Sequence, residues 1–247
     1  GNGGTSTIAT NIQGDVNDFK KIKEEVINNN ISLVFVGPED PIVNGIYDFF
    51  KSDNSLKKIK IIAPSKLAGR LEGSKEFAKK FMERYNIPTA KHGTFTRDNI
   101  DQAYMFLDNM SSPYVLKADG LAGGKGVLII HDLEEAKQEL RSMIFDKKFG
   151  ESSSKVVIEE FLDGIELSCF VLTDGNNYKI LPFAKDYKKI GEADTGLNTG
   201  GMGAISPVVF LDDVFLEKIE ERVIKPTING IMKENMEYMG IVFIGLI

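Results

Sequence analysis

The sequence has one cysteine, two histidines and no tryptophan among its 247 residues. A single cysteine excludes an internal disulfide framework and is typical of a protein from a reducing compartment. That residue, Cys169, lies in the apolar run ELSCFVL, so we expect a small core side chain rather than a nucleophile. The two histidines, His92 and His131, belong to no recognisable catalytic triad.

Long apolar runs and clusters of positive charge are also lacking. No stretch approaches the ~18–20 apolar residues of a membrane span. The opening residues, GNGGTSTIAT, lack the basic and apolar regions of a signal peptide, so we expect a cytoplasmic protein. The net charge of −6 and the even spread of Lys and Arg argue against nucleic acid as a partner.

The first part of the chain alternates helical and strand patterns. Apolar spacing predicts helices over 15–30 and 41–50, and apolar runs predict strands at 31–36, which we expect to be buried, and 58–64. This alternation indicates a parallel sheet covered by helices. The segment GPEDP follows the first strand, at the sheet edge where ligands bind. Glu39 within it is either a ligand contact or a solvated turn acid.

The pattern changes after a helix that Ser74 is expected to cap. Two strands on either side of a glycine loop, with a helix before and after, predict a small α+β lid. The segments that follow predict consecutive antiparallel strands, with 174–177 as a hairpin turn. A long helix over 217–235, bent or broken at Pro226, and a strand over 240–247 complete the pattern.

The glycine loop lies in LKADGLAGGKGVLII, residues 116–130. Glycines let main-chain N–H groups converge on an anion, and the two lysines, Lys117 and Lys125, add charges suited to phosphate. A P-loop would need Ser or Thr after its lysine and a helix to follow, whereas Gly126 and a strand follow here. The segment therefore predicts a flap between two strands that closes over phosphates, unless it is a plain glycine-rich hairpin turn.

Three further segments carry candidate contacts. VIEEFLDGIELS at 157–168 offers backbone groups to an adenine edge and a carboxylate, Glu166, to ribose hydroxyls, although acids after a strand are usually solvated. DTGLNTGGMGAISP at 194–207 predicts a loop for a small polar or phosphorylated substrate, the alternative being an irregular connection. LEGSK at 71–75 sets Lys75, by default a solvated lysine, at a helix start.

Together these segments resemble one family. GNGGTS, VGPEDPIVNGI, LEGSKEFAKKFM, VLKADGLAGGKGV, VIEEFLDGIE and DTGLNTGGMGA are similar, in this order, to motifs of phosphoribosylamine–glycine ligases (glycinamide ribonucleotide synthetases). Those are ATP-grasp ligases of purine biosynthesis. DTGLNTGGMGA is the most discriminating motif, although Leu197 stands where we associate proline with the family. The resemblance covers nearly the whole chain.

The resemblance implies an ATP-grasp fold of α/β and α+β parts. Residues 1–73 would form a partial, Rossmann-like pre-ATP-grasp domain, and 74–247 the ATP-grasp region, with its lid at about 90–160 and the start of the large sheet subdomain at 161–247. The implied partners are ATP, glycine and 5-phosphoribosylamine, with Mg²⁺ or Mn²⁺. We expect a first strand before residue 1, and the metal-holding Glu and Asn beyond residue 247, so no metal ligand is assigned and the chain alone is expected to have little activity.

The family pattern also assigns roles to residues of this chain. The catalytic residues would be Lys117 and Lys125. The nucleotide contacts would be Lys75, Lys117, Gly123, Gly124, Lys125, Gly126, Glu159, Glu160, Phe161, Leu162 and Glu166. The substrate contacts would be Asn2, Gly3, Thr5, Gly37, Pro38, Glu39, Asp186, Asp194, Thr195, Asn198, Thr199, Gly200, Gly201, Met202 and Gly203. A sister ATP-grasp ligase for another carboxylate and a non-catalytic nucleotide-binding module remain the alternatives.

Overall fold

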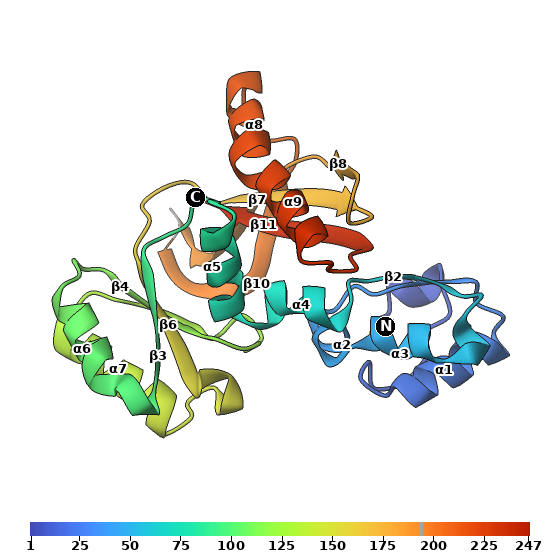
Figure 1. Ribbon diagram of the computed structural model, residues 1–247, viewed down its shortest axis with the longest axis horizontal. Coiled ribbons are helices and arrows are strands. Elements are labelled where there is room, and N and C mark those ends of the chain that lie inside the picture. The colour runs from blue at the N-terminus through green and yellow to red at the C-terminus, as the bar shows by residue number, and fades with distance from the viewer. Residues whose placement is uncertain (193–194) are drawn as a thin grey trace.

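The computed structural model describes residues 1–192 and 195–247. Its elements gather in three parts, each with its own apolar core. In Figure 1 the N-terminal part (blue) and the part built from β3 to β6 (green to yellow) lie at opposite ends of the molecule. Helices α4 (Lys66–Gly73) and α5 (Lys75–Arg84) lie between them, and α8 (Asp213–Ile219) and α9 (Lys225–Lys233), coloured orange to red, lie above.

The N-terminal part is a two-stranded parallel sheet with helices packed on it. Its elements are η1 (Thr5–Thr7), α1 (Phe19–Asn28), β1 (Leu33–Phe35), α2 (Glu39–Asn44), α3 (Ile46–Ser52), η2 (Asn54–Leu56), β2 (Lys60–Ile62) and α4 (Lys66–Gly73). The predicted parallel pairing is confirmed, with Val34 opposite Ile61. The expectation that the first strand is buried is wrong, because Leu33 and Phe35 are 46% and 56% exposed. Only the alternate residues, Val34 and Val36, pack on the helices.

The predicted helix over 41–50 is in fact two helices. Gly45 ends α2 with φ at 92°, a left-handed conformation that glycine adopts without steric cost, and α3 begins directly after it. Ile46 and Phe50 of α3 are buried in the core. Helix α4, which our reading of the sequence did not include, is capped by the Ser65 hydroxyl.

Helix α5 (Lys75–Arg84) leads into a four-stranded antiparallel sheet. The predicted cap is confirmed, because the Ser74 hydroxyl accepts a hydrogen bond from the Phe77 N–H. The sheet follows the order β3-β6-β4-β5, and helices α6 and α7 pack on it. The elements are β3 (His92–Thr96), η3 (Arg97–Asn99), α6 (Ile100–Asp108), β4 (Tyr114–Ala118), β5 (Val127–Ile130), α7 (Leu133–Phe145), η4 (Gly150–Ser153) and β6 (Lys155–Glu160).

Strand β6 corrects the predicted order of the later strands. We expected 155–164 to pair with the strand that follows it, but β6 lies between β3 and β4. Its side chains Val156 and Ile158 fill the core between this sheet and its helices. The apolar pattern predicts a strand at this position and leaves its partner open, because pairing depends on contacts distant in sequence.

The C-terminal part holds the remaining strands and helices. They are β7 (Leu167–Thr173), β8 (Tyr178–Ile180), β9 (Lys185–Gly191), β10 (Thr195–Ile205), α8 (Asp213–Ile219), the π-helical turn η6 (Glu220–Ile224), α9 (Lys225–Lys233) and β11 (Gly240–Leu246). The predicted hairpin at 174–177 is confirmed, since it joins the antiparallel strands β7 and β8. Cys169, on β7, is fully buried in the C-terminal core, as expected, and burial raises the pKa of its thiol to about 11.

Two further expectations need correction. The segment expected as a loop after residue 194 forms β10, antiparallel to β9, with register shifts between Thr195, Asn198 and Gly203. These irregularities admit Gly196 and Gly201, whose φ values are 83° and 131°. The long helix is broken as predicted, by the π-helical turn that directly precedes the helix carrying Pro226. None of the helices in 1–192 and 195–247 is long and apolar enough to cross a membrane.

Candidate functional site

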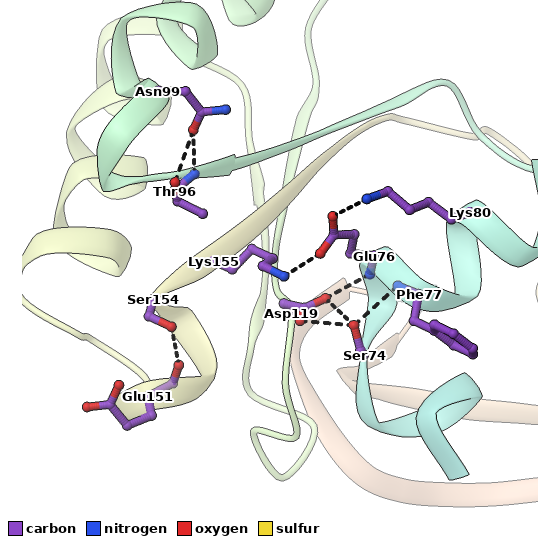
Figure 2. A network of polar contacts seen from close by, with 10 residues as sticks. All are labelled: Ser74, Glu76, Phe77, Lys80, Thr96, Asn99, Asp119, Glu151, Ser154 and Lys155. Carbon is purple, nitrogen blue, oxygen red and sulfur yellow. Dashed lines mark hydrogen bonds and ion pairs between the residues drawn. The ribbon is translucent and has the colours of Figure 1, made fainter. Parts of the chain in front are cut away.

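The N-terminus of α5 is fastened to the base of the glycine loop by Asp119. Figure 2 shows this carboxylate accepting hydrogen bonds from the Ser74 hydroxyl, 3.1 Å from both oxygens, and from the Glu76 N–H at 2.7 Å. The Lys75 N–H donates to the Asp119 carbonyl at 3.1 Å. A carboxylate at a helix N-terminus satisfies free N–H groups and complements the helix dipole. The end of β4 and the start of α5 are therefore held together.

Lys75 projects into the same junction. Its ammonium nitrogen lies 3.5 Å and 3.4 Å from the carbonyl oxygens of Asp119 and Gly120. Burial lowers the pKa of Lys75, and the Lys117 charge lowers it further, while Asp119 opposes both effects. Lys75 is thus a partly buried cation rather than a solvated side chain.

Lys117 and a second lysine of α5 meet at one buried carboxylate. The ammonium nitrogens of Lys117 and Lys79 each lie 3.0 Å from the same oxygen of Glu159, whose side chain is 6% exposed. Lys79 also donates to the Thr89 hydroxyl at 2.7 Å. Burial lowers the pKa of Lys79, an effect that Glu159 opposes. With Lys75, three ammonium groups gather below the glycine loop, which is a suitable environment for an anion.

The glycine loop itself ends in a tight turn. The Lys125 N–H donates to the Ala122 carbonyl at 3.0 Å, and both central residues, Gly123 and Gly124, have positive φ values of 56° and 75°. The Lys125 side chain is exposed. Gly126 is required for another reason, because a Cβ atom there would lie 2.7 Å from the Ala122 Cβ atom. The strand–glycine loop–strand arrangement predicted from the sequence is confirmed.

The segment after β6 leaves the sheet at the expected nucleotide contacts. Phe161 and Leu162 are 39% and 40% exposed. The Glu160 carboxylate is bound to the protein as well as to solvent, because it accepts a hydrogen bond from the Lys91 N–H at 2.8 Å. This bond fixes the end of β6 against the segment that enters β3.

Glu166 and Asp186 are joined by a lysine that the sequence did not single out. The Lys188 ammonium nitrogen lies 3.2 Å from a Glu166 oxygen and 3.3 Å from an Asp186 oxygen. Burial lowers the pKa of Lys188, but Glu166 and Asp186 outweigh it, so the pKa is raised. The Thr199 hydroxyl donates to the Lys188 carbonyl at 2.8 Å, which ties β10 to β9.

Strands β9 and β10 bring together most of the expected substrate contacts. Asp186 lies opposite Ala204, and the neighbouring Tyr187 lies opposite Gly203. Met202 is 60% exposed. Asp194 lies outside the described residues. The remaining expected contacts on β10 are Thr195, Asn198, Thr199, Gly200 and Gly201.

A separate cleft of about 390 Å³ opens at the carboxyl ends of β1 and β2, between them and β11. Gly37 and Glu39 line it, as do Glu72 and Tyr238. Burial raises the pKa of Glu72, and the charge of Glu39 raises it further. Glu39 lies in the first turn of α2, after Pro38, so it is a helix-start acid facing a cleft.

The expected contacts at the N-terminus lie apart from the lysine cluster. Asn2 and Thr5 bond each other, with the Thr5 N–H donating to the Asn2 side-chain oxygen at 2.9 Å, and Gly3 is exposed beside them. The short helix η1 carries this segment in the part of Figure 1 coloured blue, at the far end from β4 and β6. Within the described residues, no three His, Cys, Asp or Glu side chains are grouped to hold a metal ion. The residues present therefore do not fit a divalent metal site.

Comparison with known proteins agrees with this arrangement. Residues 1–72 match the N domain of phosphoribosylglycinamide synthetase, and residues 73–247 match its ATP-grasp (A) domain. The chain belongs to the phosphoribosylglycinamide synthetase family. The resemblance read from the sequence motifs is thereby confirmed.

Several relatives of this family are similar over the whole chain. The phosphoribosylamine–glycine ligase of Pasteurella multocida is 43% identical over 248 residues, which cover 100% of this chain and 56% of that protein. The bifunctional purine biosynthetic protein ADE5,7 of Saccharomyces cerevisiae is 41% identical over 255 residues, covering 100% of this chain and 31% of that protein. The chain thus spans about half or less of the relatives it matches.

Solved structures confirm the expected ATP-grasp fold. The phosphoribosylamine–glycine ligase of Thermotoga maritima aligns with a TM-score of 0.80 at 34% identity, covering 100% of this chain and 57% of that one. The biotin carboxylase domain of a Hydrogenobacter thermophilus carboxylase, in complex with MgADP, aligns with a TM-score of 0.67 at 17% identity, covering 96% and 50%. This second likeness concerns the fold alone.

Sequence reasoning missed three residues of this candidate site. Lys79 lies one helical turn after Lys75, so the spacing of four placed both on one face and was a usable signal. Asp119 directly follows a predicted strand. Its role at the N-terminus of α5 could not be predicted from the sequence, because that role depends on α5 lying beside it. Lys188 gave only a partial signal, because Asp186 lies two positions before it on β9 whereas Glu166 comes from a separate segment.

Proposed function

We propose that the protein to which this chain belongs ligates glycine to 5-phosphoribosylamine at the expense of ATP. ATP transfers its γ-phosphoryl group to the glycine carboxylate, giving glycyl phosphate and ADP. The amine of phosphoribosylamine then attacks the acyl carbon, forming the amide bond of glycinamide ribonucleotide and releasing phosphate. Family membership and the lysine cluster below the glycine loop support this proposal.

The lysine cluster is the observation that carries the proposal. Phosphoryl transfer depends mainly on positioning and on neutralising charge. Lys117 and Lys125, together with the N–H groups of residues 123–126, would contact the phosphates, and Lys75 would add its charge from α5. Closure of the glycine loop would keep water from the acyl phosphate.

The remaining contacts follow from the placement of the segments. Adenine would lie against the backbone of 159–162 and the ribose on Glu166. Glycine and phosphoribosylamine would lie near Asp186 and the segment 194–203, which β9 and β10 hold together. Residues 2–5 and 37–39 would contribute from the N-terminal part, the latter at the cleft beside α2.

The proposal includes the division of the chain and its surroundings. Residues 1–73 would form part of the pre-ATP-grasp domain and 74–247 the ATP-grasp region, with the lid at about 90–160. Mg²⁺ or Mn²⁺ would accompany ATP and neutralise phosphate charge. We propose a cytoplasmic location, in keeping with the small-molecule substrates.

The test is ADP formation by the complete gene product with Mg-ATP, with glycine and freshly generated phosphoribosylamine each supplied or omitted. We expect ADP only when both are present. The relatives in fold include a carboxylase domain solved in complex with bicarbonate and a D-alanine–D-alanine ligase. ADP formation that is stimulated by bicarbonate or D-alanine, and not by glycine, would overturn the assignment in favour of a sister ligase.

A further inference from the structure

Glu159 is a buried carboxylate with two cationic partners, one more than its charge requires. The ammonium nitrogens of Lys79 and Lys117 both lie 3.0 Å from its Oε2 atom. The side chains of Glu159 and Lys79 are 6% and 8% exposed, whereas that of Lys117 is 29% exposed. A buried carboxylate left without a partner is strongly disfavoured, so at least one of the two lysines must remain.

The two lysines differ in their other contacts. Lys79 is fixed, because its ammonium also donates to the Thr89 hydroxyl at 2.7 Å and its backbone lies within α5. Lys117 lies on β4, which leads directly into the glycine loop, and the only hydrogen bond of its ammonium group among the described residues is to Glu159. The less buried lysine with fewer contacts is therefore the one that can leave.

We infer that Lys79 is a positioning residue that keeps Glu159 paired and so frees Lys117 to bind the phosphates of the nucleotide. In this structure Lys117 pairs with Glu159. When a nucleotide binds, Lys117 moves to a phosphate oxygen, and Lys79 alone compensates the buried carboxylate. Lys79 itself need not touch the nucleotide. This inference rests on the proposed function, because it takes the lysine cluster to be the phosphate site.

If Lys79 had a structural role alone, its loss would have a different effect on ligand binding. If Lys79 only stabilised α5, its loss would weaken the binding of every ligand of the site alike. If it frees Lys117, its loss leaves Lys117 as the only partner of Glu159. Binding of phosphate would then require Glu159 to be left unpaired, so the penalty falls on phosphate-bearing ligands alone.

The experiment measures the affinity of the complete gene product for ADP and for adenosine by calorimetry. We expect Lys79→Met to weaken ADP binding about tenfold to a hundredfold, while adenosine binding changes by less than about twofold. Lys79→Arg keeps the charge and is expected to retain ADP binding. The double variant Lys79→Met with Glu159→Gln removes the buried charge, so ADP affinity should recover to within about threefold of wild type.

The possible results distinguish failure of the inference about Lys79 from failure of the proposed phosphate site. Unchanged ADP affinity in Lys79→Met, an equal loss for adenosine, or no recovery in the double variant would overturn the inference while leaving the proposed function intact. A wild-type chain that binds neither ADP nor adenosine would count against the proposed phosphate site itself, and the inference would fall with it. Circular dichroism of each variant confirms that it is folded before affinities are compared.

Discussion

At the scale of single residues, the site depends on lysines in unlike surroundings. Lys75 and Lys79 are partly or fully buried and have lowered pKa values, mainly because burial disfavours their charge. Lys125, in contrast, stands exposed at the tip of the glycine turn. Under the proposed function, the buried lysines set the local potential, and the exposed one would approach a ligand as the loop closes.

Replacement of Lys125 by alanine tests that division. We expect ATP affinity to fall about threefold to tenfold, because one charge contact to phosphate is lost, while the free energy of unfolding changes by less than ~0.5 kcal/mol. Lys147→Ala is the matched control, since Lys147 is an exposed lysine of the same part and pairs with Glu151. Calorimetry and urea unfolding measure the two quantities. An equal loss of ATP affinity in both variants would show that the loss comes from the change in net charge and not from a contact of Lys125 with phosphate.

Cys169 gives a prediction about alkaline pH. Burial raises the pKa of its thiol from 9.0 to about 11. Between these values the unfolded chain loses the proton and the folded chain keeps it, so the free energy of unfolding falls as pH rises from 9 to 11. The loss approaches about 2–3 kcal/mol at the upper end.

Urea unfolding at pH 8 and at pH 10.5 checks this prediction. Wild type and Cys169→Ala are compared, because the buried tyrosines also titrate at high pH in both proteins. The variant should lose less stability between the two pH values than wild type. Equal losses would mean that the thiol does not contribute, and rapid alkylation of the native protein at pH 8 would contradict its burial.

At the scale of elements, the sequence predicted the positions of helices, strands and turns better than it predicted which strands pair. The cap at Ser74, the hairpin at 174–177 and the break near Pro226 all follow from local chemistry, and all are present. The pairing of β6 between β3 and β4 could not be read in this way, because a strand's pattern of apolar residues does not name its neighbour.

The missed ion pairs have the same origin. Lys79 reaches Glu159, which lies 80 positions later in the chain and becomes its neighbour only when α5 packs beside β6. A glycine-rich sequence can also form a strand, as β10 does, when bulges place its glycines at positive φ. Composition alone favoured a loop there.

Packing of α9 on α5 gives an element-scale prediction at Gly230. A Cβ atom there would lie 2.5 Å from Cζ of Phe81 and 2.7 Å from Cδ2 of Tyr85. We expect Gly230→Ala to destabilise the protein by about 1–2 kcal/mol, because the clash exceeds the ~1 kcal/mol gain in helix propensity. Met232→Ala, at an exposed position of the same helix, is the control and should change little. Urea unfolding decides between them, and a stabilised Gly230→Ala would show that the two helices are less tightly packed.

At the scale of the whole molecule, a chain of net charge −6 holds a local cluster of positive charge. The cluster lies where α5, the end of β4 and the end of β6 converge, so it depends on elements from two of the three packed parts. An overall acidic surface disfavours binding of polyanions such as nucleic acid, while a recessed group of lysines can still bind a small phosphorylated ligand. The same arrangement explains why the family resemblance is spread over separate motifs rather than one.

The most direct measurement is the binding of ATP to this chain, by calorimetry, for wild type and Lys117→Met. We predict that wild type binds ATP more tightly than adenosine. The Lys117→Met variant should bind ATP at least about tenfold more weakly than wild type, while its binding of adenosine remains. Equal affinity of the two proteins for ATP would contradict the assignment of the lysine cluster as the phosphate site.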